Sequence, residues 1–374
     1  MPNRVKKLIV VPGHGVVVVQ TRKALSDTGS RRKAIEPGQP MPESTHPNHV
    51  LYPGCKPFPA LPPCVHYAGS KKLLRKSIQL QLESAMDGQP AFDISADCED
   101  GAPSGCEHEH AEMISAVIAG ADNRFGRIGC RIHGLHHPAW LDDLEVIVGG
   151  AGQMLAYLAF PKAERAEDVR NQILALEEVR ARHGIRRAIP VHVLIETPGA
   201  LREAWQIAEL PLVECLDFGI MDYISAHHGA IPATAMQSPG QFDHPLVARA
   251  KCEIATAAVG NGVVPSHNVT LEFGDTDRVA EDARRARREF GFLRMSSIHP
   301  TQIQPIVAAM RPDFSEVEEA TAIVIAGQDA DWGPISRVGQ LHDRASYRYW
   351  WELLQRAHAT GMALPESARR RFFR

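Results

Sequence analysis

The feature that most constrains the fold is an alternation of eight short apolar runs with amphipathic stretches over about 235 residues. The runs expected to form strands are residues 64–67, 91–96, 127–132, 156–160, 191–195, 215–219, 262–264 and 293–297. Helical spacing of apolar residues marks the stretches 71–86, 109–120, 140–149, 166–183, 201–209, 245–259 and 275–290. Strands that alternate with helices indicate parallel βα units. Eight such units predict an α/β fold, a (β/α)8 TIM barrel.

The two ends of the chain extend beyond these units. Residues 8–19 are apolar after a basic start and resemble a secretory signal, but Pro12 and Gly13 interrupt them, so we expect a small hairpin or an edge strand. Prolines are dense over 20–63, which favours an extended linker over regular helix. Helical patterns at 315–327 and 345–360 exceed what a barrel needs. The expected domains are an N-terminal extension (1–61), the barrel (62–312) and a C-terminal helical lid (313–374).

Composition narrows the class of protein. Lys and Arg number 41 against 44 Asp and Glu, a balance that argues against a nucleic-acid-binding or membrane-surface protein. The seven cysteines are scattered without a CxxC pair, which favours reduced thiols in the cytoplasm over a disulfide framework or a structural zinc site. No GxGxxG or P-loop pattern is present, so the sequence gives no sign of a tightly bound nucleotide cofactor.

Polar side chains follow the expected strands, where a βα barrel places its functional groups. Glu196 and Asp222 would face each other across a ring that also holds Arg131. Carboxylates with retained waters are the ligands that Mg²⁺ prefers. Each acid alone could equally cap a helix or lie on the surface. Their coincidence with a cation at successive strand ends favours a metal site.

The strand ends also carry a resemblance to a known family. The segments concerned are, in chain order, 92–102 (FDISADCEDGA), 130–133 (CRIH), 160–164 (FPKAE), 194–200 (LIETPGA), 219–223 (GIMDY), 297–303 (SIHPTQI) and 339–343 (GQLHD). Together they resemble the motifs of the HpcH/HpaI aldolase/citrate lyase β-subunit family over roughly residues 62–360. No single motif is decisive, but seven in the family's order form a specific pattern.

The resemblance implies a carbon–carbon lyase that cleaves or forms a β-hydroxy acyl thioester, or a related hydroxy acid, to give a 2-oxo acid or aldehyde and an acyl product. Mg²⁺ is the implied cofactor, with Mn²⁺ as the alternative. Glu196 and Asp222 would bind the metal, Glu196 also contacting the substrate, and Glu99 and Asp100 would hold metal-bound waters. Arg131 would bind the oxo-acid oxygens and stabilise charge.

By the same resemblance, Asp343 would be the catalytic acid/base, delivered by the C-terminal lid to a neighbouring subunit of a homo-oligomer, a trimer or hexamer. The alternative is that Asp343 only caps the helix that begins near Ala345. The implied partners are a small oxo or hydroxy acid and acyl-CoA. A thioesterase on the same metal site, or a non-catalytic ligand-binding member of the family, are the other functions that the residues allow.

Several positions depart from the family pattern. Pro62, Pro63 and Cys64 stand where the family's first strand usually opens with an arginine, His133 replaces the usual asparagine, and no proline follows Asp343. His108 and His110 are two residues apart and cannot share a helix face, which argues against a zinc site. We expect the pairs 136–137 and 227–228 to be exposed loop histidines, His299 to shape the barrel or the pocket wall, and the basic run 284–288 to be a solvated helix face.

Overall fold

The computed structural model describes residues 6–10, 16–20, 46–52, 58–86 and 88–373. The chain divides into two compact units, 1–42 and 43–374. In the first unit, β1 (Lys6–Val10) pairs antiparallel with β2 (Val16–Gln20), which confirms the predicted small hairpin. Most of the linker predicted over 20–63 lies outside the described residues.

The described part of that linker corrects one expectation. Proline density predicted no regular helix, yet α1 (Pro47–Leu51) is helical. Its proline occupies the first turn, where the missing N–H costs no hydrogen bond. The Trp351 indole N–H donates to Asn48 Oδ1 at 2.7 Å, so α1 is held against α14 (Arg344–Ala359).

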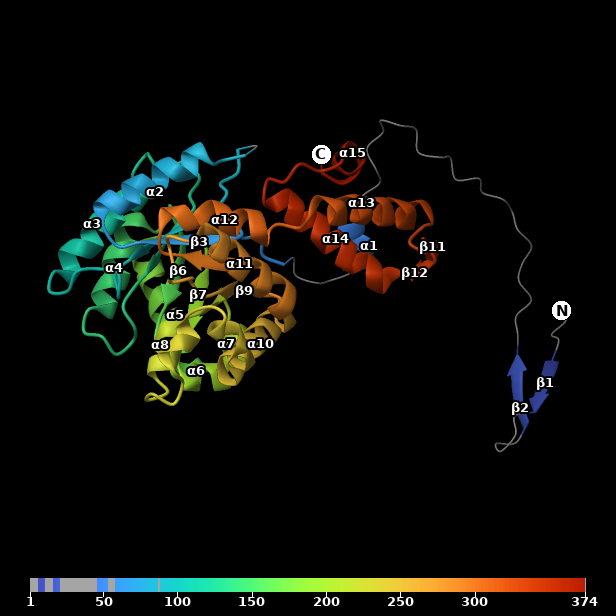
Figure 1. Cartoon of the computed structure of the whole chain (residues 1–374), viewed down its shortest axis with the longest axis horizontal. Coiled ribbons are helices and arrows are strands. Elements are labelled where there is room, and N and C mark those ends of the chain that lie inside the picture. The colour runs from blue at the N-terminus through green and yellow to red at the C-terminus, as the bar shows by residue number, and fades with distance from the viewer. Residues whose placement is uncertain (1–5, 11–15, 21–45, 53–57, 87, 374) are drawn as a thin grey trace. The chain divides into compact units, whose positions relative to one another are not determined.

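Eight parallel strands form a closed barrel in the second unit (Figure 1). They are β3 (Cys64–Ala68), β4 (Asp93–Asp97), β5 (Ile128–Arg131), β6 (Leu155–Phe160), β7 (Val191–Ile195), β8 (Val213–Phe218), β9 (Val264–His267) and β10 (Arg294–Ser297). β10 closes the barrel by pairing with β3, Met295 opposite Cys64. This confirms the predicted (β/α)8 fold.

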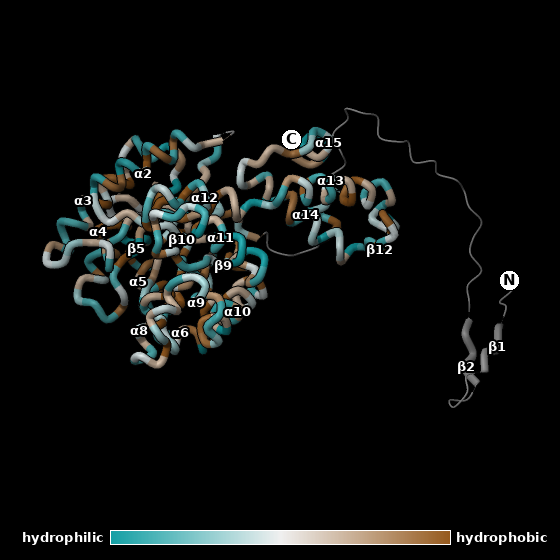
Figure 2. The backbone as a smooth tube through the Cα atoms, viewed as in Figure 1, coloured by the Kyte–Doolittle hydropathy of each residue, from teal (hydrophilic) through white to brown (hydrophobic). Residues whose placement is uncertain are grey.

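Helices follow every strand and surround the barrel. They are α2 (Lys71–Glu83), α3 (Glu107–Ala119), α4 (Trp140–Ala151), α5 (Ala166–Arg182), α6 (Pro198–Arg202), α7 (Ala204–Ala208), α8 (Ile220–Ser225), α9 (Gly240–Asp243), α10 (Pro245–Gly260), α11 (Thr276–Phe290) and α12 (Pro300–Met310), with the 3₁₀ turn η2 (Ala233–Met236). Hydrophobic and hydrophilic stretches alternate along this part of the chain (Figure 2). Such a pattern gives each helix one apolar side for the sheet.

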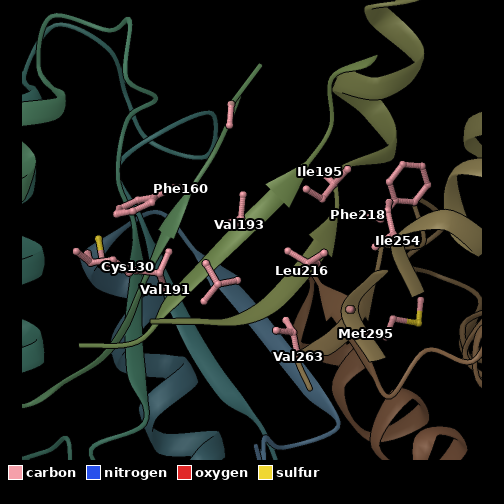
Figure 3. Packing of buried hydrophobic residues seen from close by; sticks show 14 of the residues in the cluster. Cys130, Phe160, Val191, Val193, Ile195, Leu216, Phe218, Ile254, Val263 and Met295 are labelled. Atoms are coloured by element: carbon pink, nitrogen blue, oxygen red, sulfur yellow. The ribbon is translucent and has the colours of Figure 1, made fainter. Parts of the chain in front are cut away.

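Alternation along each strand produces two different interiors. One side of the sheet packs against the helices in a large apolar core that includes Val191, Val193 and Leu216 (Figure 3). The residues between them face the inside of the barrel, where a small apolar cluster of Val65, Tyr157, Ala159 and Leu194 is surrounded by buried polar groups. The period of two in a strand therefore separates an apolar outer core from a polar inner one.

Strand β9 and helix α12 differ from the sequence prediction because of their prolines. β9 begins at Val264, two residues after the expected start, and runs to His267. The prediction ended too early because Pro265 and the polar residues after it argue, in a sequence, against a central strand. Helix α12 was not predicted. Its Pro300 fits the first turn, but Pro305 lies inside the helix and interrupts the helical pattern in the sequence.

After the barrel come α13 (Phe314–Asp329), the hairpin β11 (Ile335–Arg337) with β12 (Gln340–His342), α14 and α15 (Glu366–Phe372). The second half of α14 packs at the amino-terminal ends of the barrel strands, because Glu352 and Arg356 line one cavity together with Val264 and Leu293. Among the described helices, none combines the length and apolar character needed to cross a bilayer.

Candidate active site

The carboxyl ends of the barrel strands form the mouth of the barrel and carry its acids. Glu99 and Asp100 follow β4, Glu196 follows β7, and Asp222 lies in the first turn of α8 after β8. Arg131 is the last residue of β5. Parallel strands bring these ends to one edge, so residues more than 100 positions apart in the chain become neighbours.

Glu196 is the most perturbed acid of the mouth. Its side chain is buried, and Oε1 accepts a hydrogen bond from the Lys162 backbone N–H at 2.7 Å. Burial, and then the nearby Asp222 charge, raise the pKa of Glu196 to about 8. A Cβ at Gly219 would lie 2.2 Å from Glu196 Oε2, so only glycine leaves room for this carboxylate beside the end of β8.

Lys162 brings the acids together, although the sequence gave it no role. Its ammonium forms ion pairs with Glu99 and with Asp100 (3.0 Å), and lies 3.9 Å from Asp222. Partial burial alone would lower the pKa of Lys162, but hydrogen bonds to Glu99 and Asp100 outweigh it and raise the pKa well above its usual value. Its backbone adopts the left-handed region, with φ 53°. Lys162 follows the end of β6, and from this position its side chain reaches three acids of the mouth.

Arg131 is held by Asp97, a second residue to which the sequence assigned no role. The guanidinium donates to both Asp97 oxygens, at 2.8 and 2.6 Å, and Nη1 lies 3.0 Å from Glu99 Oε2. Asp97 also accepts from the Glu99 and Gly101 backbone N–H groups. It therefore fixes both the arginine and the loop that presents Glu99 and Asp100. The acidic segment 97–100 already contained Asp97, but its pairing with Arg131 depends on the register of β4 and β5.

The oxygen donors of the mouth fit a hard divalent cation. Five carboxylates (Asp97, Glu99, Asp100, Glu196 and Asp222) face two cations (Arg131 and Lys162), a surplus of three negative charges when all are ionised. Mg²⁺ prefers this donor chemistry and needs only one or two direct carboxylates. The described chain holds one group of three ligand-type side chains within 4.8 Å of one another, His192, Cys215 and Asp217, and that group lies buried inside the barrel.

A cavity of about 390 Å³ opens beside these acids. The loop 98–107 after β4, the loop 133–137 after β5, and Lys162 line it. His133 is buried in its wall, and its Nδ1 lies 2.6 Å from Asp143 Oδ2. Sequence reasoning noted His133 only as a departure, since Asp143 is ten residues away and belongs to helix α4.

Asp343 interacts with the first turn of its own helix and is separate from the acids of the mouth. It is exposed at the start of α14, and its Oδ1 accepts from the Ala345 and Ser346 backbone N–H groups at 2.9 and 3.3 Å. Asp343 is thus a helix cap in this structure. Since α14 packs at the amino-terminal ends of the strands of its own barrel, its own mouth is at the opposite end.

The remaining histidines take other roles. His110 bonds to the Asp97 backbone oxygen at 2.9 Å, while His108 pairs with Asp142 at 2.7 Å, so the two imidazoles do not converge on a common metal. His299 caps α12 and stacks on Phe273 with ring centroids 5.0 Å apart. His227 bonds to the Tyr223 backbone oxygen.

A match to a family model establishes the protein family of this chain. The model described as HpcH/HpaI aldolase/citrate lyase matches residues 97–300, more than half of the chain, and covers all the mouth acids named above. The chain belongs to the HpcH/HpaI aldolase/citrate lyase family. Membership of this family makes the protein an enzyme of the carbon–carbon lyase class, as the sequence predicted.

Relatives of known name agree with this family. A malyl-CoA/β-methylmalyl-CoA/citramalyl-CoA lyase of Chloroflexus aurantiacus is 25% identical over 273 residues, which cover 68% of this chain and 77% of that protein. A citrate lyase crystal structure from Burkholderia xenovorans LB400 is 49% identical, with a TM-score of 0.77, covering 87% of this chain and 98% of that one. CitE of Mycobacterium tuberculosis, solved with magnesium, acetoacetate and coenzyme A, is 23% identical with a TM-score of 0.60 (80% and 99% covered) and shares the fold.

Proposed function

We propose that the protein is a Mg²⁺-dependent lyase that cleaves or forms a β-hydroxy acyl thioester, with a 2-oxo acid or aldehyde and a shorter acyl thioester as the other reactants. The surplus of negative charge at the mouth is the observation that carries this proposal, since oxygen donors gathered there need a cation beyond Lys162. The names of relatives, malyl-CoA and citramalyl-CoA lyases, support the same substrate class.

Glu196 and Asp222 would hold the metal, and Glu99 and Asp100 would hold its waters. When bound, the divalent ion supplies Lewis-acid stabilisation of the charge that develops on substrate oxygens. Arg131 adds a fixed cation beside that position, already oriented by Asp97. Lys162 forms ion pairs with Glu99 and Asp100 and so holds both carboxylates in place.

Product analysis tests this function. The purified protein is incubated with malyl-CoA or citramalyl-CoA in Mg²⁺, and in a matched sample with excess EDTA. We expect a 2-oxo acid or aldehyde together with a shorter acyl-CoA, formed only with Mg²⁺. Free CoA with the intact hydroxy acid would instead identify a thioesterase, and no turnover of any β-hydroxy acyl thioester would identify a non-catalytic member.

Asp343 is proposed as the acid/base that protonates or deprotonates the α-carbon of the shorter acyl thioester, acting in the mouth of a neighbouring subunit of a homo-oligomer. Helix α14 packs at the end of its own barrel opposite to the mouth, so Asp343 lies far from the acids of its own chain. A catalytic role for Asp343 therefore requires a site shared between two subunits. Asp343→Asn should lose about 10²–10⁴ in rate without a lower melting temperature, since asparagine caps helices as well as aspartate does.

A mixing experiment separates the shared site from the cap. Inactive Asp343→Asn and inactive Glu196→Gln proteins are combined under conditions that exchange subunits. Partial recovery of activity is expected, because some mouths then receive both intact residues. Wild-type activity in Asp343→Asn alone would leave Asp343 only its capping role.

A further inference from the structure

A second cavity lies at the end of the barrel opposite to the mouth. Its volume is about 290 Å³, and three parts of the chain form its walls. α1 with the segment 58–61 forms one wall, the starts of β9 and β10 form another, and the second half of α14 forms the third. The described residues that line this cavity are all different from those of the mouth, so a ligand here would bind apart from the lyase substrate.

Apolar side chains make up much of the wall. Phe58 and Leu61 come from the segment before β3, Val264 opens β9, and Leu293 directly precedes β10. Covering such a surface with an apolar ligand group is favourable by about 25 cal/mol for each Å² buried. The volume is close to the lower end of the range of about 300–1,000 Å³ that ligand pockets occupy. The cavity therefore suits a small molecule with an apolar body.

Arg356 of α14 brings a positive charge to this apolar wall. Its Nη2 donates to the Met310 backbone oxygen at 3.3 Å, and among the described residues no acid forms an ion pair with it. Asp313 and Glu316 pair with Arg287 instead, at 3.4 and 3.3 Å. Burial, and then the Arg287 charge, lower the pKa of Arg356 to about 10. A partly buried guanidinium in this setting is stabilised by an anionic ligand group.

Glu352 lies one turn before Arg356 on the same face of α14 and lines the same cavity. At this spacing Cβ atoms are about 5–6 Å apart, and a glutamate that precedes a basic residue by four positions commonly pairs with it. In this structure the two side chains form no ion pair, and no other described cation pairs with Glu352. An acid and a base thus border the cavity side by side, each with its charge available to a ligand.

We propose that this cavity binds a free α-amino acid with an apolar side chain, its carboxylate paired with Arg356 and its ammonium with Glu352. An amino acid carries both charges on one carbon atom, which matches a cation and an acid one helical turn apart. Its side chain would lie against the apolar wall. At ~30 Å³ per water, 290 Å³ is the room of about ten waters, and leucine has about as many non-hydrogen atoms. The cavity thus favours leucine and amino acids of similar size.

An occupied cavity would attach α14 more firmly to its own barrel. The ligand would contact Glu352 and Arg356 on the helix, and Val264 and Leu293 at the barrel. A molecule that binds only the folded protein raises its apparent stability. L-Leucine should therefore raise the melting temperature, whereas glycine, which offers both charges but no apolar side chain, should not.

Ligands that differ by one charged group test the assignment. L-Leucine, 4-methylpentanoate, which lacks the ammonium, and 3-methylbutylamine, which lacks the carboxylate, are titrated calorimetrically into the intact protein. No Mg²⁺ or lyase substrate is present. In the wild type we expect L-leucine to bind about tenfold or more tightly than either analogue, because each analogue leaves one charged side chain without its hydrogen bond.

Two variants remove the charges of the cavity one at a time. In Arg356→Gln, L-leucine should bind no more tightly than 3-methylbutylamine, while in Glu352→Gln it should bind no more tightly than 4-methylpentanoate. Each variant loses a different preference, which a general loss of stability does not produce. Glu319→Gln changes an exposed acid of α13 outside the cavity and is the matched control, with all affinities within about twofold of wild type.

Absence of L-leucine binding to the wild type would overturn the site. Equal binding of L-leucine and 4-methylpentanoate would identify a simple carboxylate site and overturn the amino-acid assignment, as would unchanged preferences in both glutamine variants. Because the titrations involve neither Mg²⁺ nor the mouth, none of these results bears on the proposed lyase function.

Discussion

The barrel holds two groups of buried charges, one in its interior and one at its mouth. In the interior, Asp93 accepts from Arg127 at 2.6 and 2.7 Å and from Arg294 at 2.6 Å, and Asp93 and Arg294 are fully buried. Nearby, His192 lies 3.1 Å from Glu214 and 3.9 Å from Asp217. Three carboxylates thus meet two arginines and a histidine.

The mouth also combines carboxylates with basic side chains, but here the acids outnumber the cations. Five carboxylates face Arg131 and Lys162. Glu196 is buried and forms an ion pair with neither cation among the described residues, and the nearby Arg131 charge offsets only part of the rise in its pKa. A buried charge is tolerated when it is paired and becomes costly when it is not. In the interior each carboxylate has an arginine or histidine within 4 Å, which supports the fold, whereas the acids of the mouth outnumber their cations and prepare a place for one more.

The largest expected effect comes from removing charge at the mouth. Glu196→Gln should abolish Mg²⁺-dependent cleavage, a loss of more than about 10³-fold, because it removes a metal ligand while keeping the volume of the side chain. Activity is measured over a range of Mg²⁺ concentrations. The melting temperature without metal should not fall, since a desolvated acid is removed. Wild-type activity at the same Mg²⁺ concentration would disprove the ligand assignment.

A change in the interior should act on stability. Asp93→Asn leaves Arg294 and Arg127 without their shared carboxylate, and breaking such a buried pair costs about 3–5 kcal/mol. Urea unfolding measures the loss in the free energy of unfolding. Mg²⁺ affinity of the folded protein, followed by calorimetry, should stay within twofold of wild type. A stable variant with weakened metal binding would mean that the two groups are not separate.

Arg131→Lys tests whether Arg131 belongs to the catalytic mouth or to the structural interior of the barrel. Lysine keeps the charge but cannot reproduce the paired donors that Arg131 directs at Asp97, so we expect kcat/KM to fall by about 10²-fold, or ~2.7 kcal/mol. Steady-state kinetics with saturating Mg²⁺ provides the measurement. Unchanged kinetics would make Arg131 a packing residue of the barrel interior.

The smallest effect concerns pH in the metal-free protein. Burial holds the pKa of Glu196 near 8 in the folded state, above its value in the unfolded chain, so folding favours the protonated acid. Stability from this group is present at pH 4.5 and declines as pH rises toward 8, by up to about 1.4 kcal/mol per pH unit. Urea unfolding in EDTA at pH 5.5, 6.5 and 7.5 should show wild type losing stability relative to Glu196→Gln. Parallel curves for the two proteins would contradict this account.

Local patterns in the sequence determined the strands, most of the helices and the order of the strand-end acids. Val191–Ile195 has the bounds that the apolar run predicted, because Val191, Val193 and Ile195 place β-branched side chains at every second position, which is a strong local signal for a strand. The prediction misplaced the strand Val264–His267 and missed the helix Pro300–Met310. Both contain prolines, and the strand also contains polar residues, which disfavour a regular element by local propensity. Tertiary packing outweighed that propensity.

The sequence by itself determined the barrel, the family and the acids that end its strands. Only the tertiary structure decided which cation meets which acid. Lys162 joins Glu99, Asp100 and Asp222, and Asp97 holds Arg131, because strand register and barrel closure bring these residues together. The pairing of His133 with Asp143 depends likewise on where α4 packs. Which charged groups pair depends on their distance in the folded structure, and a sequence pattern does not contain that distance.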